Sequence, residues 1–215
     1  MHGITAATRF EQKPAGRLQT LTQALAGTSA DQVWGFTYNP AGQIVTRGGS
    51  NDAYGSNTAY PVERGYTVNG LNQYETAGPA TFAYDANGNL KSDGSTTFTY
   101  DAENRLVKAE GAKTATLSYD PLGRLWQVTG SGSTTRFFYD GDRLISETDG
   151  SGNLLRAYAH GAGADTPLVW WELTPGAGPV RRFLHADHQG SIVAVSDAER
   201  RNITTMRDLR VLAAQ

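Results

Sequence analysis

Cysteine is absent from this 215-residue sequence, which excludes disulfide bonds, thiolate zinc sites and thiol catalysis. The sequence also lacks an apolar run near the length of a membrane span, and it has no charged start followed by an apolar stretch, the pattern of a signal peptide. Neither sign of charge dominates, since 19 basic and 21 acidic residues give a formal net charge of −2. We therefore expect no membrane span and no nucleic-acid partner, and the chain's own localisation stays unknown.

Glycine and aromatic residues, in contrast, are plentiful. The 25 glycines are too many for a helical bundle and suit a protein made mostly of strands and turns. A hydrophobic content of 39% is enough for a sizeable core. Length and composition therefore favour a folded β protein over a tail or linker.

One short phrase occurs five times: an aromatic residue or Leu, any residue, Tyr, then Asp or Asn, a short turn, and Leu or Ile. The copies begin at Phe36, Phe82, Phe98, Leu117 and Phe137. A degenerate copy from Phe10 to Leu18 has Gln12 in place of Tyr. Since the spacing of most copies equals one hairpin with its connection, the sequence predicts a stack of antiparallel β-hairpins.

Each part of the phrase has a structural interpretation. The aromatic residue and the Tyr are two positions apart, so they share one face of a strand, and the Tyr covers the neighbouring hairpin. Asp or Asn starts the turn, Gly accommodates its fourth position, and Leu or Ile opens the return strand. The predicted structural residues are Tyr38, Tyr84, Tyr100, Tyr119, Tyr139, Gly42, Gly88, Gly123, Ile44, Leu90, Leu106, Leu125 and Leu144.

This pattern resembles the RHS (rearrangement hotspot) family, whose members carry Tyr-Asp (YD) repeats. Three further segments strengthen the resemblance: residues 66–78, residues 160–172, and residues 181–197, whose Asp187-His188-Gln189-Gly190-Ser191 is similar to a segment of the RHS core. The resemblance implies an all-β fold of stacked or spiralling hairpins, present here as an open-ended fragment of a shell. It also implies a secreted or cell-surface protein, with the remainder of the shell and a C-terminal toxin as partners.

Four segments are expected along the chain. They are a degenerate first repeat and linker at 1–35, a hairpin array at 36–158, an RHS-core-like segment at 159–197, and a divergent tail at 198–215. Residues 48–57 are polar and rich in turn formers, and we expect a long loop there. Strands are expected at 168–171 and 192–195. The tail departs from the family pattern, which favours a truncated or frame-disrupted copy.

Several residues invite a chemical function. His185, Asp187, His188 and Ser191 suggest a hydrolase or metal site, but on a strand His188 would face away from His185 and Asp187, which favours a structural role. Asp85-Asn87-Asn89 and Asp149-Ser151-Asn153 have the alternating oxygens of a calcium loop but lack its later Gly and Glu, so turns are favoured. Trp126, Trp170 and Trp171 are possible sugar-stacking residues.

Three functions remain, and we favour the first. The chain is predicted to be a non-catalytic part of a shell that encloses or displays a toxin or effector, without cofactor, metal or catalytic residue. The alternatives are a module that binds carbohydrate or protein through exposed aromatic residues, and part of a self-cleaving aspartyl protease core of the RHS type, whose cleavage segment is not found in this sequence.

Overall fold

A computed structural model describes residues 7–25, 29–54, 63–163, 166–174, 176–198 and 203–205. Apart from one three-residue 3-10 turn, η1 (Asp52–Tyr54), every regular element in these residues is a β-strand, which confirms the predicted all-β class. All the strand pairs recorded are antiparallel, as in stacked hairpins. No helix in the described chain has the length and hydrophobicity needed to cross a membrane.

The chain divides into two compact units, of which unit 1 contains residues 1–59 and 156–215 and unit 2 contains residues 60–155. Unit 1 is therefore built from the two ends of the sequence, and unit 2 from its middle. This division follows spatial contacts, whereas the boundaries expected at residues 35, 158 and 197 follow the repeat pattern and stay a prediction.

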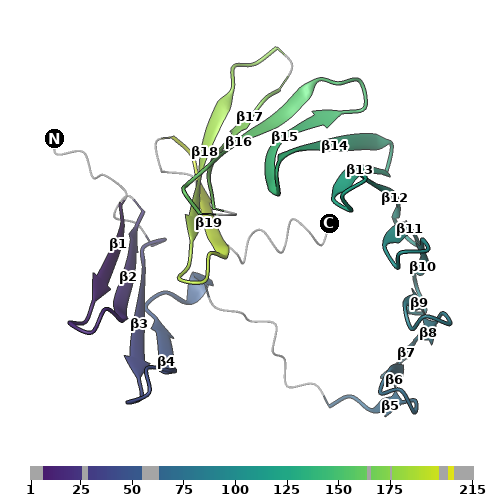
Figure 1. Ribbon diagram of the computed structural model, residues 1–215, viewed down its shortest axis with the longest axis horizontal. Helices are drawn as coiled ribbons and strands as arrows, with labels where there is room; N and C mark the ends of the chain where they lie inside the picture. Colours follow the sequence, from purple (N-terminus) through teal and green to yellow (C-terminus); the bar gives the residue numbers. More distant parts are fainter. Residues whose placement is uncertain are drawn as a thin grey trace. The chain divides into compact units, whose positions relative to one another are not determined.

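Unit 1 contains two runs of strands that pair in chain order (Figure 1). The first is a four-stranded sheet of β1 (Ala7–Gln12), β2 (Leu18–Ala24), β3 (Gln32–Tyr38) and β4 (Ile44–Gly49). The second consists of β16 (Leu154–His160), β17 (Pro167–Glu172), β18 (Val180–Ala186), β19 (Ile192–Ser196) and β20 (Ile203–Thr205). The strands expected at 168–171 and 192–195 are thus present as β17 and β19.

A hydrophobic core lies in unit 1 and joins these two runs. Its buried residues are Leu21, Leu25, Trp34, Phe36 and Tyr54 from the N-terminal part, with Val193 and Ala194 from β19. Alternate residues of β3 are buried, which is the period of two expected for a strand with one face on a core. Residues more than 130 positions apart in the sequence therefore bury each other.

The loop expected at 48–57 is partly wrong. Gly48 and Gly49 are the last residues of β4, and Tyr54 in η1 is buried, with its hydroxyl donating to the Ala30 carbonyl at 2.6 Å. The Tyr54 ring also meets Trp34 edge to face at 6.5 Å between centroids. Polar and glycine-rich composition concealed this single anchoring aromatic residue. Residues 55–57 lie outside the described residues.

Unit 2 is an array of short hairpins (Figure 1). Three strands form one small sheet: β5 (Tyr66–Val68), β6 (Tyr74–Ala77) and β7 (Ala80–Thr81). The following strands pair in chain order: β8 (Ala83–Tyr84), β9 (Leu90–Ser92), β10 (Thr97–Tyr100), β11 (Leu106–Glu110), β12 (Thr114–Tyr119), β13 (Leu125–Gly130), β14 (Ser133–Asp140) and β15 (Arg143–Asp149). Among the described residues of unit 2, Ala77 and Glu147 are the buried ones. Strand pairing and turn contacts, not a core, therefore hold these hairpins together.

The repeat fixes the register of every hairpin in the same way. Tyr100 lies opposite Leu106, and Tyr119 opposite Leu125, with a one-residue register shift just before each Tyr. The same shift precedes Tyr38, Tyr84 and Tyr139. The Leu or Ile after the turn therefore opens the return strand directly across from the repeated Tyr.

Candidate functional site in the turns and joints between hairpins

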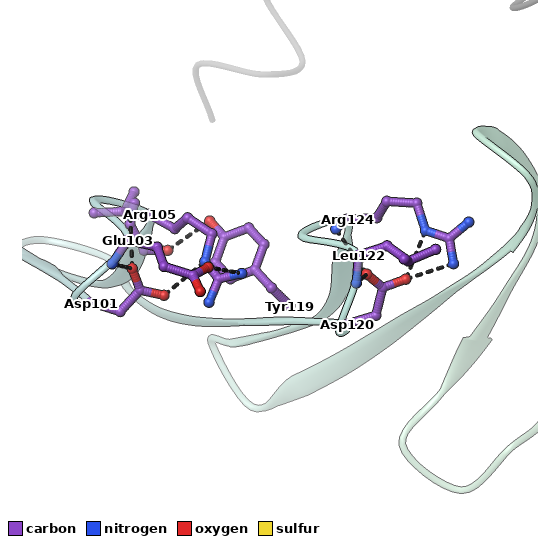
Figure 2. Close-up of polar contacts among 8 residues, drawn as sticks. Asp101, Glu103, Arg105, Tyr119, Asp120, Leu122 and Arg124 are labelled. Carbon is purple, nitrogen blue, oxygen red and sulfur yellow. Dashed lines mark hydrogen bonds and ion pairs between the residues drawn. The ribbon is translucent and has the colours of Figure 1, made fainter.

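Eight of the described turns share one hydrogen-bonded geometry. At Asp120, one carboxylate oxygen accepts the backbone N–H groups of Leu122 and Arg124 at 2.9 Å, and the other accepts the Arg124 Nε at 2.7 Å (Figure 2). The backbone closes the turn with Asp120 N–H to Arg124 O and Gly123 N–H to Asp120 O, both 2.9 Å. Both backbone bonds recur in the turns that begin at Lys13, Asn39, Asn69, Asp85, Asp101, Asp149 and Asp187.

The fourth position of these turns has a left-handed backbone, which explains its residue type. Gly123 has φ 80° and Gly190 has φ 86°, a conformation that glycine adopts without steric cost. Asn104 and Asn72 hold the same position with φ 61° and 59°, as expected of the non-glycine residue that best tolerates it. The Asp, Gly and Asn of the phrase therefore serve the turn.

These hydrogen bonds favour the charged form of the turn carboxylates. The pKa of Asp101 is lowered, chiefly by the backbone N–H of Arg105, with a further hydrogen bond from its guanidinium. The side-chain amide of Asn89 lowers the pKa of Asp85, and that of Asn153 lowers the pKa of Asp149. The two segments with calcium-loop spacing are thus turns in which both carboxylate oxygens accept hydrogen bonds from the turn itself.

Successive hairpins are joined through the repeated Tyr. The Tyr119 hydroxyl donates to the Leu106 carbonyl at 2.8 Å, and the Arg105 guanidinium lies 4.9 Å from the centre of the Tyr119 ring (Figure 2). The Arg and the Leu are neighbours that end the preceding turn. One Tyr is therefore held both at its edge and on its face by the hairpin before it, in an arrangement that we call an arginine joint.

Two other arginine joints have the same geometry. Tyr139 donates to the Leu125 carbonyl at 2.8 Å with Arg124 at 4.9 Å from its ring centre. In unit 1, Tyr38 donates to the Leu18 carbonyl at 2.7 Å with Arg17 at 5.5 Å. The degenerate first copy lacks the Tyr, but its Arg-Leu pair still contacts the Tyr of the next copy.

Tyr84 and Tyr100 differ from these three. In the described chain, neither hydroxyl makes a recorded hydrogen bond to the preceding hairpin, and no guanidinium lies over either ring. The turns before them end with Gln73 and Asn89 in place of Arg, and these amides bond the next turn, at Gly88 O (3.3 Å) and Asn104 Oδ1 (2.8 Å). We call these contacts amide joints. The sequence interpretation missed this role of the Arg, although its place directly before a repeated Leu was a visible signal.

The core-like segment forms another of these turns, directly after the end of a strand. β18 ends at Ala186, and Asp187 accepts the backbone N–H groups of Gln189 and Ser191 at 2.9 and 3.0 Å. Gly190 takes the left-handed position. His188 and Asp187 are consequently not on alternate faces of a strand.

This turn docks on the first sheet within unit 1. The buried Asp187 carboxylate also accepts Arg47 Nη2 at 3.3 Å, and the His188 ring lies 4.7 Å from that of Phe36. Gln23 Nε2 donates to the Ala186 carbonyl at 2.7 Å. We name this set of contacts the Asp187 clasp, and it joins segments 140 and 163 positions apart in the sequence.

The geometry of the clasp does not assemble a hydrolase triad. His185 Nε2 lies 2.9 Å from Ser196 Oγ, and Ser196 is fully buried, so a substrate in solvent does not reach that hydroxyl. Ser191 contributes its backbone N–H to the turn. The described residues contain no group of three or more His, Cys, Asp or Glu positioned to hold a metal ion.

The three tryptophans proposed for sugar stacking have different surroundings within their own units. Trp126 in unit 2 is exposed, but Arg136 lies 5.7 Å from its ring centre. Trp170 packs edge to face with Tyr158 at 6.4 Å, and Trp171, as the next residue on β17, points to the other side. A row of aromatics that the sequence interpretation missed lies in unit 2, where Tyr74 contacts Tyr66 at 5.3 Å and Phe82 at 6.3 Å.

Comparison with known proteins relates this arrangement to a family. The family model described as Teneurin YD-shell matches residues 17–207. The tRNA nuclease WapA of Bacillus subtilis strain 168 is 34% identical over 138 residues, and the tRNA(Glu)-specific nuclease WapA of Bacillus subtilis subsp. natto is 33% identical over the same length. Each match covers 61% of this chain but 6% of the relative, so the chain corresponds to a small part of those proteins.

Among solved structures, a Tc holotoxin pore from Photorhabdus luminescens has a TM-score of 0.49 at 13% identity, covering 89% of this chain and 14% of that one. A TcdB2–TccC3 complex has a TM-score of 0.35 at 12% identity, covering 91% of this chain and 14% of that one.

Proposed function

The chain belongs to the Teneurin YD-shell family, and we propose that it is a section of shell wall with a structural role, in a protein whose shell encloses or displays a toxin or effector. The arginine joint is the observation that carries this proposal. At Tyr38, Tyr119 and Tyr139, the repeated Tyr contacts the Arg and the Leu of the preceding hairpin. A repeat that uses its defining residues in this way builds an array.

The small extent of the WapA match supports a division of roles between parts of the protein. Those relatives are named as nucleases, and the matched segment is a small fraction of their length. We infer that a toxic activity associated with this chain belongs to another part of the protein and that the hairpins described here hold or surround it. Membership of the YD-shell family supports the further proposal of a secreted or cell-surface protein with the remaining shell as its partner.

A direct test is to incubate the purified 215-residue chain with tRNA and a divalent cation, alongside full-length WapA as a positive control. The expected result is intact tRNA, and an unchanged single protein band after prolonged incubation. Cleavage of tRNA would contradict the structural role. Self-cleavage of the chain would instead favour the alternative of an RHS protease core.

A chimaera tests the wall function itself. The 138-residue segment of Bacillus subtilis WapA is replaced by the matching segment of this chain, and protease sensitivity and nuclease activity are compared with those of native WapA. A wall section should substitute for another, leaving both properties within about twofold of native. A matched control chimaera carries Tyr119→Ala and Tyr139→Ala, which remove two joints. Equal results for both chimaeras would contradict the proposal.

A binding function is the second candidate, favoured by the row of Tyr66, Tyr74 and Phe82. Tyr66 and Tyr74 are 56% and 49% exposed, and the neighbouring Leu71 is 78% exposed. Exposed apolar groups of this kind mark interaction surfaces. Binding of oligosaccharides or peptides that is lost with Tyr74→Ala, and kept with Trp126→Ala, would support it.

A further inference from the structure

Two kinds of joint follow each other along unit 2. Amide joints at Gln73 and Asn89 connect the hairpins from β5 to β10, and arginine joints at Arg105 and Arg124 connect those from β10 to β15. The change of joint coincides with a change in the preceding residue, from Gln or Asn to Arg, while the turn geometry stays the same. The residue that ends the turn therefore distinguishes the two halves of the array.

The half with amide joints has shorter strands, and its repeated Tyr residues make fewer contacts with the preceding hairpin. Its strands β7, β8 and β9 have two, two and three residues, whereas β12, β14 and β15 have six, eight and seven. Short strands form fewer ladder hydrogen bonds, and Tyr84 and Tyr100 lack the hydroxyl and ring contacts that Tyr119 and Tyr139 make. Its first hairpin is also largely exposed, with Tyr66, Val68 and Leu71 at 56%, 51% and 78%.

We propose that the strands from β5 to β10 form a seam, the part of the wall that opens by local unfolding while the strands from β11 to β15 stay folded. The Arg that ends a turn is the positioning residue that decides between the two states, because it orients the next Tyr toward the Leu carbonyl. This inference rests on the proposed function, since a seam gives a wall that encloses an effector a place to open. Local opening of weakly held segments is a general property of folded proteins.

Hydrogen exchange of the full 215-residue chain tests the seam. Protection factors, corrected for sequence-dependent intrinsic rates, are compared between backbone amides of β8 to β10 and those of β12 to β15. Hydrogen-bonded amides in the seam should exchange at least about tenfold faster, the factor that corresponds to one lost joint contact of about 1.4 kcal/mol. Equal protection of hydrogen-bonded amides in both halves would overturn the proposal.

A substitution that introduces the missing Arg shows whether the joint, and not the strand length alone, sets the exchange rate. Asn89→Arg places an Arg directly before Leu90, ahead of Tyr100, and Asp85 is positioned to accept it as Asp101 accepts Arg105. Exchange in β9 and β10 should slow by about tenfold. Asn153→Arg is the matched control, because it ends an equivalent turn before Leu154 with no arginine joint of this type recorded there. The positioning role would be refuted if hydrogen exchange in the strands beside the substituted turn slowed in both variants. It would also be refuted if exchange slowed in neither variant.

The converse substitution replaces an Arg by Gln, a residue type that ends equivalent turns elsewhere in the chain. Arg124→Gln keeps a side-chain amide at the turn, as Gln43 and Gln73 do in theirs, and should speed exchange in β14 and β15 toward the rate of the seam. Arg124→Lys keeps the charge without the planar guanidinium, and we expect it to restore part of the protection. If Arg124→Gln unfolds unit 2 as a whole, the gain in Asn89→Arg remains the deciding measurement.

The outcomes for the seam and for the wall are distinguishable. A uniform exchange profile removes the seam but leaves the chimaera experiment untouched. If the chimaera loses protease resistance or nuclease activity while fast exchange is confined to the seam, the seam opens locally but the chain is not a container wall.

Discussion

Replacing Asp187 by Ala should loosen two parts of unit 1 that are far apart in the sequence. The carboxylate accepts three groups: the backbone N–H of Gln189, the backbone N–H of Ser191 and the guanidinium of Arg47. The first two hold the turn, and the third holds the turn against the first sheet. One substitution therefore removes both the hydrogen bonds that close the turn and the ion pair that holds the turn against the first sheet.

The magnitude follows from these three contacts. Each lost backbone hydrogen bond costs about 1 kcal/mol. The ion pair adds about 0.5 kcal/mol, because the Arg47 side chain is 36% exposed and solvent screens it. The expected loss for Asp187→Ala is about 2–3 kcal/mol of unit 1 stability. Asp187→Asn should cost about 1 kcal/mol, since Asn39 and Asn69 start equivalent turns with an amide oxygen.

The assay is urea unfolding combined with residue-resolved hydrogen exchange. In Asp187→Ala, protection should fall in β2 and β3, around Leu21 and Trp34, as well as in the turn itself. Asp149→Ala is the control, because Asp149 makes the same turn bonds in unit 2 without a clasp. A loss of protection limited to residues 187–196, with β2 and β3 unchanged, would refute the coupling between the two segments.

Three further predictions address the joints and the titrating groups. Tyr139→Phe removes the hydroxyl bond to Leu125 and should lower the stability of unit 2 by about 1 kcal/mol in urea unfolding, whereas Tyr100→Phe should have almost no effect. The folded pKa of Asp101 lies below its ordinary 3.8, so its stabilisation is present above that value and is lost as the pH falls below it; urea midpoints measured in acid should decline less steeply in Asp101→Asn. Burial, and then the charge of Asp31, raise the pKa of Tyr54 from 10.0 to about 12, so the stability that this Tyr contributes is complete below pH 10 and is lost as the pH rises toward 12. Ultraviolet titration of the tyrosines should show a group that ionises near pH 12 and that disappears in Tyr54→Phe.

The local parts of the fold could be predicted from the sequence because their causes are local. A turn such as Asp120 to Arg124 is closed by hydrogen bonds among five consecutive residues. The turn can therefore be predicted from the types of those residues. The pairing of Tyr119 with Leu125 then follows from the turn. Arg105 was overlooked because its partner, Tyr119, is in the next hairpin, and charged residues after a turn are ordinarily assigned to solvent.

The clasp had no local signal. Phe36, Arg47 and Gln23 look like ordinary members of the first repeats, and their partners at residues 186–188 follow more than 130 positions later. The segment around Asp187 was recognised as distinct from the repeats, yet its geometry is that of a repeat turn. It differs from the other repeat turns in its contacts with the first sheet and not in its backbone.

The discontinuous composition of unit 1 sets an order on its folding. Hairpins of unit 2 form from contacts close in sequence, such as the pairing of Thr116 with Lys108, and need nothing from the chain ends. The core around Leu21 and Trp34 is completed by Val193 and Ala194, so it is incomplete until most of the chain has been synthesised. Until then, the β1–β4 sheet exposes the face that the clasp later covers, and its own edges are open to pairing. We therefore attribute the placement of an Asp-started turn at residues 187–191 to closure: it caps the N-terminal sheet at the last stage of folding, with the turn geometry that also closes the hairpins at Asp85, Asp101 and Asp120.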